Sequence, residues 1–342
     1  MKAVVFDDFG DADVLYLADQ PDPQPGPGQV RIRVGAVGVN HVDLDIRAGV
    51  SRLPISFPHI LGLEFAGTIE SLGEQVDGWR VGDRVAPYYQ LVCRRCEACL
   101  RGAQMHCEKL QMFGIQRPGG YAELVVVDAD ELMRLPDRLG FDAAAAVQTT
   151  YGTAWRCLVT RAKVQPGETV LVSAAGSGVG SAAVQIAKLM GARVLASAGS
   201  DAKLERALAQ GADAVVNYST DNINKVARKF TDGKGVDVAF EHVGGDIFGA
   251  SLEAVAIGGR VTVCGGHAGE VVPVDLIDLF RTEHTVIGCA RATHGEIRTV
   301  MRLVGGGRLA PVLGAVLPLA DAARGHQMLG DRMAYGKVIL QP

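Results

Sequence analysis

The chain has 342 residues, of which 48% are hydrophobic and 21% are charged, and its formal net charge is −4. This composition predicts a globular protein of two domains, since a domain usually has about 150 residues. The lack of a basic stretch argues against nucleic acid or an anionic membrane as a partner. No apolar run reaches the ~20 residues of a membrane-spanning helix, and the N-terminus lacks the apolar core of a signal peptide, so we expect a cytoplasmic protein.

The first 135 residues are rich in valine, glycine and proline and favour short strands. Apolar runs at residues 30–34, 65–69 and 121–127 predict strands, and residues 21–28 (PDPQPGPG) predict a loop. The alanine-rich residues 141–147 predict a helix. The chain therefore begins with a β-rich domain.

Strand-like and helical segments alternate from residue 170 onward. Short apolar strands are predicted at residues 170–173, 193–198, 214–218, 237–242 and 260–264. Helical patterns fill the gaps, notably at residues 201–210, and a final strand is predicted at residues 337–340. This alternation predicts an α/β fold with a parallel, doubly wound sheet.

Four cysteines lie close together in the first third of the chain with the spacing C-x2-C-x2-C-x7-C: Cys93, Cys96, Cys99 and Cys107. Four thiolates can close a tetrahedron around one Zn²⁺ and leave no position open for chemistry. The spacing therefore predicts a structural zinc lobe at about residues 90–110. The other three cysteines, Cys157, Cys264 and Cys289, stand among apolar residues and are expected to be small buried side chains rather than disulfide partners.

A glycine-rich turn follows the strand at residues 170–173 and opens a helix. The residues of this turn that we expect to bind a dinucleotide are Ala174, Gly176, Ser177, Gly178, Val179 and Gly180. Glycines let the backbone approach a pyrophosphate, and the helix N-terminus offers N–H groups and partial positive charge. The strand, turn, helix and second strand together predict a nicotinamide dinucleotide site.

The end of the second strand decides which dinucleotide is expected. An NAD enzyme has a carboxylate there, but this strand runs into Gly199 and Ser200, which are neutral. Asp201 is expected to N-cap the next helix or to point to solvent. Lys203 and Arg206 could meet a 2′-phosphate, so we favour NADP(H); the alternative is that both cations lie on a solvated helix face. Further cofactor contacts are expected from Tyr218, Val243, Cys264 and Gly265.

The chain resembles the medium-chain dehydrogenase/reductase superfamily, which includes zinc alcohol dehydrogenases and quinone oxidoreductases. Besides the cysteines and the turn, the resemblance rests on residues 57–67 (FPHILGLEFAG), 76–84 (VDGWRVGDR), 119–123 (GGYAE) and 336–338 (GKV). It implies a GroES-like catalytic domain built from residues 1–150 and 291–342, with a Rossmann domain, residues 151–290, inserted between them. It also implies a small-molecule substrate and a homodimer or homotetramer, with residues 285–290 pairing across the dimer.

The resemblance breaks at the catalytic zinc. In zinc alcohol dehydrogenases three side chains bind this metal, and the corresponding positions here are Asn40, Leu63, and Gln148 or Thr149. An amide and an aliphatic side chain cannot replace a thiolate and an imidazole around Zn²⁺. In this respect the chain is similar to zinc-free quinone and enoyl reductases, which add a hydride from NADPH to a conjugated C=C bond or a quinone.

Three residues are candidates for the catalytic groups. Asn40 is expected to donate to the substrate or the nicotinamide, and His41 has a side chain suited to proton transfer at neutral pH. Asp45 stands where quinone reductases often have a tyrosine, so the proton donor stays unassigned. Tyr88 and Tyr151 are weaker candidates, and either could serve packing alone.

Three alternatives stay open on the sequence. His41, Asp43, His59 and Glu64 could rebuild a metal site of nitrogen and oxygen ligands. The chain could be an alcohol or aldehyde dehydrogenase, because the cysteine lobe is commoner among the zinc enzymes. It could also be a sensor that binds NADPH without turning it over.

Overall fold

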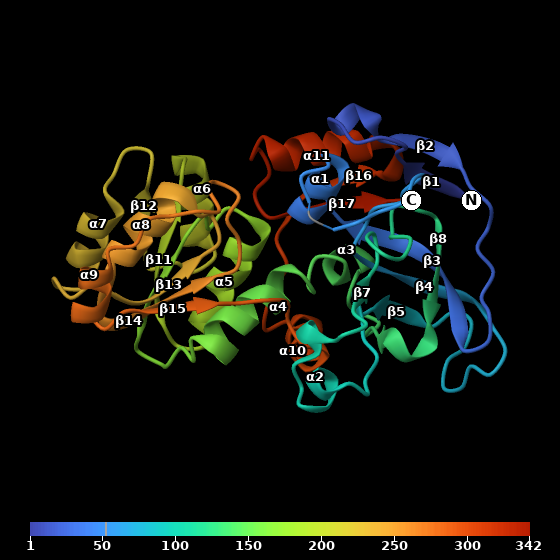
Figure 1. Cartoon of the computed structure of the whole chain (residues 1–342), viewed down its shortest axis with the longest axis horizontal. Coiled ribbons are helices and arrows are strands. Elements are labelled where there is room, and N and C mark those ends of the chain that lie inside the picture. The colour runs from blue at the N-terminus through green and yellow to red at the C-terminus, as the bar shows by residue number, and fades with distance from the viewer. Residues whose placement is uncertain (52) are drawn as a thin grey trace. The chain divides into compact units, whose positions relative to one another are not determined.

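The computed structural model describes residues 1–51 and 53–342, and these divide into two compact units. The terminal unit comprises Met1–Thr149 and Thr293–Pro342, and the inserted unit comprises Thr150–Ala292. Both ends of the chain therefore belong to the same unit (Figure 1). Within the described residues, no helix is long and apolar enough to cross a membrane.

The terminal unit is built on a sheet of seven strands. They are β3 (Gln29–Gly38), β4 (Glu64–Leu72), β5 (Arg84–Pro87), β8 (Leu124–Asp128), β9 (Leu132–Arg134), β16 (Leu313–Pro318) and β17 (Lys337–Gln341). Their order is β16-β17-β3-β4-β5-β9, and β8 pairs with β3. The long strand β3 buries Val30, Ile32 and Val34 at alternate positions, as expected of a strand with one face on a core. The last strand of the chain, β17, pairs antiparallel with β3 and so completes this sheet.

Short elements surround the sheet. Two further pairs of strands are β1 (Lys2–Val5) with β2 (Tyr16–Asp19) and β6 (Gln90–Leu91) with β7 (Gln111–Met112). The helices of this unit are α1 (His41–Arg47), α2 (Glu97–Leu100), α3 (Phe141–Ala144), α10 (His294–Gly305) and α11 (Ala322–Gly330). Four 3-10 turns lie at Ala12–Val14, Gln104–His106, Ala129–Glu131 and Leu319–Asp321. The helix predicted over residues 141–147 is thus present but shorter, since α3 ends at Ala144.

The inserted unit has a sheet of six parallel strands. They are β10 (Thr169–Val172), β11 (Arg193–Ala198), β12 (Ala214–Asn217), β13 (Val236–Glu241), β14 (Val255–Val263) and β15 (Thr285–Gly288). Their order is β12-β11-β10-β13-β14-β15, which is the strand order of a dinucleotide-binding Rossmann sheet. The predicted α/β class, with a doubly wound parallel sheet beside a β-rich domain, is confirmed.

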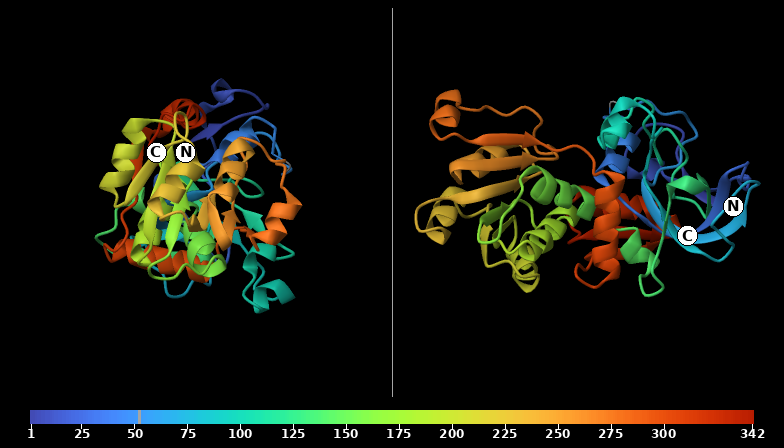
Figure 2. Two further views of the ribbon diagram at one scale, coloured as in Figure 1. Left: turned by 90° about the vertical axis from the view of Figure 1, so that its left-hand side faces the viewer. Right: turned by 90° about the horizontal axis from the view of Figure 1, so that it is seen from below.

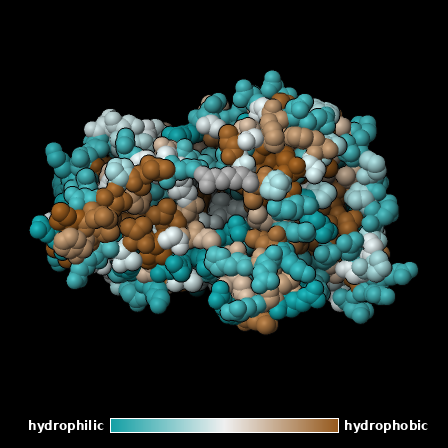
Figure 3. Space-filling model, in the orientation of Figure 1, coloured by the Kyte–Doolittle hydropathy of each residue, from teal (hydrophilic) through white to brown (hydrophobic). Residues whose placement is uncertain are grey.

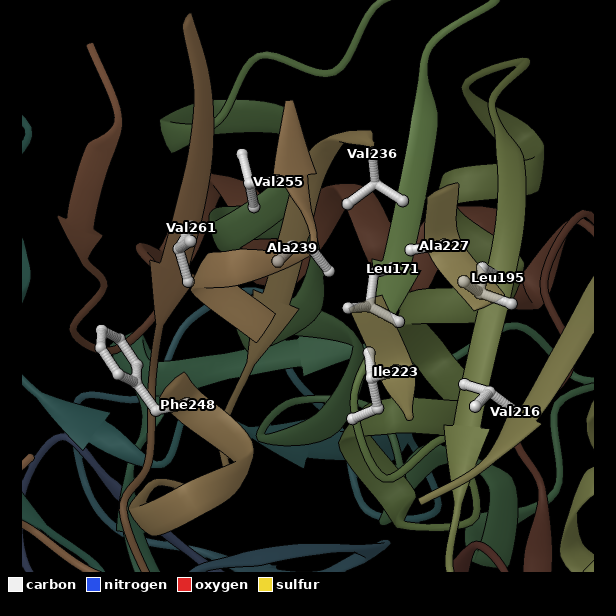
Figure 4. Close-up of a cluster of buried hydrophobic side chains, with 11 residues drawn as sticks. Leu171, Leu195, Val216, Ile223, Ala227, Val236, Ala239, Phe248, Val255 and Val261 are labelled. Carbon is white, nitrogen blue, oxygen red and sulfur yellow. The ribbon is translucent and has the colours of Figure 1, made fainter. Parts of the chain in front are cut away.

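Helices cover this sheet (Figure 2). They are α4 (Thr150–Trp155), which continues as a π-helical segment over Arg156–Arg161, and α5 (Gly178–Leu189), α6 (Asp201–Ala209), α7 (Ile223–Phe230), α8 (Gly245–Glu253) and α9 (Leu276–Arg281). Leu171, Leu195 and Val216 of neighbouring strands belong to one buried cluster, in which Ile223 of α7 lies near Leu171 and Phe248 of α8 lies near Val261 (Figure 4). Complete burial of a side chain of this size contributes about 1.5–3 kcal/mol, so this core fixes the strands whose ends carry the cofactor turn.

Candidate functional site

The four cysteines predicted to bind zinc lie together. The sulfur atoms of Cys93, Cys96, Cys99 and Cys107 are all within 4.8 Å of one another. Backbone N–H groups point at them: Cys93 N donates to Cys107 Sγ over 3.3 Å, and Cys96 N donates to Cys93 Sγ over 3.3 Å. Hydrogen bonds from the backbone of Arg95 and Cys96 lower the pKa of the Cys93 thiol to about 6. Four thiols in this arrangement fit tetrahedral Zn²⁺.

The alternative metal site is not assembled. Among the described residues, the four cysteines are the only group of three or more His, Cys, Asp or Glu side chains with ligand atoms this close. The Nε2 atom of His59 lies 2.8 Å from the Gly114 carbonyl oxygen. Asp43 accepts from the backbone N–H groups of Asn40 at 2.8 Å and Gly62 at 3.4 Å. Both side chains therefore form hydrogen bonds with backbone groups.

A buried lysine stands beside Asn40. Strand β17 pairs with β3 at Ile339 and Gly38, and β4 begins with Glu64 opposite the same glycine. These pairings bring Lys337, the first residue of β17, next to the end of β3 and the start of β4. Its side chain is almost fully buried, with 5% of its surface exposed against 0% for Glu64.

The Lys337 ammonium donates to three oxygen atoms. These are Glu64 Oε1, Asn40 Oδ1 at 2.5 Å and Thr149 Oγ1 at 3.2 Å. A lysine ammonium has three protons, so this set satisfies it completely. The other Glu64 oxygen accepts from Thr149 N over 3.0 Å. The carboxylate thus neutralises the buried cation, and the two neutral side chains complete its hydrogen bonding.

Gly38 leaves the space that this arrangement needs. A Cβ atom on Gly38 would lie 2.7 Å from Lys337 Cε and 2.4 Å from the Ala145 carbonyl oxygen. Contacts below 3.0 Å are not tolerated by a real side chain. The glycine is therefore needed because the Ala145 backbone approaches it closely, and the Lys337 stem lies over the same position.

Asp43 forms a second buried acidic group near the same place. Its side chain lies in the first turn of α1 and is 1% exposed. Burial raises the pKa of Asp43 to about 7, although the backbone N–H of Asn40 and the charge of Lys337 act in the opposite direction. A carboxyl group with this pKa can hold a proton at neutral pH.

The three predicted catalytic residues lie at the start of α1. Asn40 precedes the helix, His41 is its first residue, and Asp45 follows four residues later, so His41 and Asp45 share a helix face and both are half-buried. Asn40 Nδ2 donates to the Gly38 carbonyl oxygen over 3.3 Å. The catalytic roles of these three residues stay predictions.

The weaker tyrosine candidates both have side-chain hydrogen-bond partners. Tyr88 stacks on His294 with ring centroids 3.9 Å apart, and its hydroxyl accepts from Arg298 Nε over 3.1 Å. The Tyr151 hydroxyl accepts from Gln185 Nε2 over 2.8 Å. Gln148, one of the two candidates for a third zinc ligand, donates to the Pro87 carbonyl oxygen over 2.7 Å.

The glycine-rich turn has the geometry expected of a phosphate-binding turn. Ser177 is the N-cap of α5, and its hydroxyl oxygen accepts from Gly180 N over 2.9 Å. Ala174 has a φ of +45°, and a Cβ on Gly180 would lie 2.3 Å from the Ala174 carbonyl oxygen. Gly178 and Val179 form the first turn of α5, whose free N–H groups suit an anion. His242 was not predicted here, yet its Nε2 lies 3.0 Å from Ser177 Oγ.

The residues predicted for the adenosine side lie near the same turn. A Cβ on Gly176 would be 2.8 Å from Lys203 Cδ, and a Cβ on Gly199 would be 2.8 Å from the Tyr218 hydroxyl. The Lys203 stem therefore lies against the turn. Arg206 is exposed one helical turn further along α6.

Asp201 is not the N-cap of this helix, because Ser200 takes that position and Asp201 is the first residue of α6. The N-cap alternative was therefore wrong by one residue. The Asp201 side chain accepts instead from Asn217 Nδ2 over 2.8 Å, and the residue is exposed, as the other alternative expected.

Val243, Cys264 and Gly265 follow β13 and β14 at the carboxyl edge of the sheet. Val243 N donates to the buried carboxylate of Glu241 over 2.6 Å, and burial raises the pKa of that group. Cys264 N donates to the Glu241 carbonyl oxygen over 3.2 Å. Because the turn after β10 lies at the same edge, the predicted cofactor residues are gathered at one end of the parallel strands.

Comparisons with known proteins agree with both units. Residues 26–137 match the alcohol dehydrogenase GroES-like domain, and residues 178–305 match the zinc-binding dehydrogenase family. Quinone oxidoreductase from Sus scrofa is 32% identical over 99% of this chain and 97% of its own length. The chain belongs to the medium-chain dehydrogenase/reductase superfamily. It is accordingly an oxidoreductase, and members of this superfamily bind NAD(P).

Two further relatives of the superfamily carry different names. Acryloyl-coenzyme A reductase from Sulfurisphaera tokodaii is 29% identical over the full length of both chains. The crystal structure of an NAD-dependent alcohol dehydrogenase is 43% identical and matches the whole of both chains with a TM-score of 0.96. The superfamily is therefore shown, whereas the substrate class differs among the relatives.

The lysine cluster, which we define as Lys337, Glu64, Asn40 and Thr149, was missed as a unit. Asn40 was predicted to stand at one zinc-ligand position, and Thr149 was one of two candidates for another; both contact the Lys337 ammonium. Lys337 was predicted only as the start of the final strand and as part of the closing GKV motif. A lysine at the first position of a strand that is otherwise apolar (KVIL) was the available signal.

Replacing Lys337 with methionine should destabilise the terminal unit strongly, because it leaves the Glu64 carboxylate buried without its cation. The expected loss in the free energy of unfolding is about 3–5 kcal/mol, measured by urea denaturation. The double variant Lys337→Met, Glu64→Leu should recover most of this loss.

The matched control is Lys2→Met, since Lys2 forms an exposed ion pair with Asp19 in the same unit. That variant should lose less than about 1 kcal/mol. Equal losses in the two single variants would show that the Lys337 pair is not the buried, neutralised unit described above.

Proposed function

We propose that the protein is an NADPH-dependent reductase of activated alkenes or quinones that works without a catalytic zinc. The observation that carries this proposal is the lysine cluster. In this cluster the Lys337 ammonium contacts Asn40, which stands at one predicted ligand position, and Thr149, one of the two candidates for another. A divalent cation placed beside this ammonium would be repelled, and neither oxygen has the charge of a thiolate.

The proposed chemistry needs no Lewis acid. The nicotinamide supplies the hydride when it is bound. Hydride addition to a conjugated C=C bond or a quinone places negative charge on an oxygen atom, where a hydrogen bond can stabilise it. An alcohol dehydrogenase, in contrast, must ionise an unactivated hydroxyl group. A metal stabilises the resulting negative charge by several kcal/mol, on the order of 3 or more.

Asn40 is the group that we assign to the substrate oxygen. Lys337 and Thr149 hold its Oδ1, so the Nδ2 protons are the part of the amide that is left to donate. One of these protons is directed to the Gly38 carbonyl oxygen, and the second is available to a substrate carbonyl. His41 and Asp45 are the proposed proton-transfer groups, and Asp43 can hold a proton behind Asn40 at neutral pH.

One structural zinc per chain is part of the proposal. Cys93, Cys96, Cys99 and Cys107 would hold it with four sulfur ligands. A zinc site with four protein ligands stabilises its lobe and has no open position for substrate. The metal therefore contributes to folding in this account and takes no part in hydride transfer.

The named relatives support both this proposal and a second candidate. A quinone oxidoreductase and an acryloyl-coenzyme A reductase are relatives over essentially the whole chain. The second candidate is an NAD-dependent alcohol dehydrogenase, which the 43% identity to a structure of that name favours. A nucleotide-binding sensor without turnover is a third, and the intact turn is compatible with all three.

Substrate assays separate these candidates. With NADPH, we expect turnover of short enones, acryloyl-type thioesters or benzoquinones, followed as loss of absorbance at the nicotinamide band. We expect no oxidation of primary or secondary alcohols with NAD⁺ or NADP⁺. Alcohol oxidation that a chelator abolishes without unfolding the protein would contradict the proposal, and failure with every acceptor would favour the sensor.

The choice of NADPH rests on Lys203 and on the lack of a carboxylate after β11. The Lys203 stem lies against Gly176, which supports the proposal that its ammonium binds a phosphate on the adenosine ribose. Lys203→Ala should raise the KM for NADPH tenfold or more, because a charge-assisted hydrogen bond is worth about 1.5–3 kcal/mol. The KM for NADH should change little.

Arg206→Ala is the companion variant, because Arg206 is exposed one turn further along the same helix. It should have a smaller effect on NADPH than Lys203→Ala. If neither variant changes the ratio of the two KM values, or if the wild type prefers NADH, the assignment of NADP(H) is wrong.

A homodimer through the inserted unit is also proposed. Strand β15 is the edge of its sheet, and an unpaired edge is a template for another strand. Beside it, α9 has no buried residue, and Leu276, Ile277 and Phe280 are exposed. Figure 3 shows hydrophobic residues gathered on the face that carries α9 and β15. A second copy of the chain, paired through β15, would cover this surface.

A further inference from the structure

His242 lies beside the glycine-rich turn, at the edge of the sheet where the predicted cofactor residues gather. It is the residue that follows β13, and β13 is the neighbour of β10, so both strands lead into this edge. Ser173 N donates to the Phe240 carbonyl oxygen over 3.0 Å and so extends the strand pairing up to the turn. The side chain of His242 then reaches the turn, where its Nε2 atom lies 3.0 Å from Ser177 Oγ.

Backbone contacts fix the position of His242 from two sides. The buried Glu241 carboxylate accepts from Val243 N over 2.6 Å and from Gly244 N over 3.1 Å. On the other side, a Cβ on Gly265 would lie 2.6 Å from the His242 carbonyl oxygen, so the loop after β14 packs closely against this residue. The contact between the imidazole and Ser177 is therefore built on a well-held backbone.

The Ser177 hydroxyl has one proton to donate and two positions at which it can accept. Gly180 N fills one of the accepting positions over 2.9 Å. When His242 has a proton on Nε2, it fills the second, and the Ser177 proton is left for another acceptor. When Nε2 has no proton, the Ser177 hydroxyl donates to the imidazole instead. His242 thus controls where the Ser177 proton is directed.

A dinucleotide places its diphosphate at the N-terminus of the helix that follows the glycine-rich turn. Ser177 is the N-cap of this helix, α5, so its hydroxyl lies where phosphate oxygens are expected. Negative charge at this place favours the arrangement in which His242 donates to Ser177 and Ser177 donates to a phosphate oxygen, since hydrogen bonds to a charged acceptor are the stronger ones.

We propose that His242 is a positioning residue of the dinucleotide site, whose Nε2–H group holds the Ser177 hydroxyl in the orientation that donates to the diphosphate. It acts through Ser177 and needs no contact of its own with the cofactor. The inference rests on the dinucleotide site of the proposed function. It does not depend on the choice of NADPH or on the substrate, because NADPH and NADH share the diphosphate.

Dissociation constants for NADPH and NADH, measured by calorimetry on the zinc-loaded protein, test this role. His242→Leu should raise both constants by the same factor, about tenfold, which is the effect of losing one hydrogen bond to a charged group. His242→Gln should recover most of the affinity, because its side-chain amide can still donate to Ser177. A residue that served packing alone would not be rescued by an amide in preference to leucine.

The matched control is His284→Leu. His284 directly precedes β15 and therefore lies at the amino edge of the same parallel sheet, opposite the turn. This variant should leave both dissociation constants unchanged.

Ser177→Gly tests the same contact from the other side, since glycine is tolerated as an N-cap and the imidazole stays in place. It should weaken both cofactors as His242→Leu does. The double variant Ser177→Gly, His242→Leu should bind them no more weakly than Ser177→Gly alone, because the two residues act as one unit.

Unchanged constants in Ser177→Gly would overturn the proposal even if His242→Leu does not fold. Losses that add in the double variant would overturn it as well, because His242 would then act independently of Ser177, and so would a loss confined to NADPH. A wrong assignment of NADP(H) has a different signature: the wild type prefers NADH and Lys203→Ala has no effect, while the His242 variants still weaken both cofactors. If the wild type binds neither cofactor, the dinucleotide site and this role are both wrong.

Discussion

The ion pair between Lys337 and Glu64 is the interaction on which the candidate site depends. Both charges are removed from water, so each requires the other, and the Asn40 and Thr149 side chains complete the hydrogen bonding of the cation. The pair joins residues at opposite ends of the chain. Strand β17 must pair with β3 for the ammonium to reach its place. The site is therefore assembled only when both ends of the terminal unit have paired.

If the proposed function is right, this arrangement lets one scaffold keep a zinc lobe without a zinc reaction. The four cysteines lie in their own lobe around α2, and their contacts with a metal need nothing from Asn40 or Glu64. At the candidate site, a fixed positive charge remains, but it is carried by a side chain whose three protons are already used. It can polarise the Asn40 amide and hold it in place, while it cannot bind a substrate oxygen as an open metal position does. The chemistry that suits such a site starts from an electrophile that is already activated.

Much of the fold could be predicted from local pattern. The alternation of strand and helix after residue 170 predicted the parallel sheet, and glycines at the turn predicted the opening of α5, because both depend on neighbouring residues. Asp201 shows the limit of such reasoning: Ser200 and Asp201 are both good N-caps, and the backbone decides between them. The shortened α3 has the same origin, since helix ends depend on packing.

The lysine cluster could not be predicted in this way. Lys337 meets Asn40 across 297 positions of sequence, through strand pairing that no periodicity shows. The sequence did supply half of the argument, since Asn40 and Leu63 excluded the usual zinc ligands. The structure added the Lys337 cation that contacts Asn40.

The central claim is that hydride transfer proceeds with a single zinc that lies away from Asn40. The most direct measurement is the zinc content per chain of the purified active enzyme, combined with an anomalous diffraction map at the zinc edge. The account predicts one zinc per chain, bound by Cys93, Cys96, Cys99 and Cys107, and no anomalous peak near Lys337. A second zinc bound at Asn40 or Glu64 in the active enzyme, with Lys337 displaced, would contradict it.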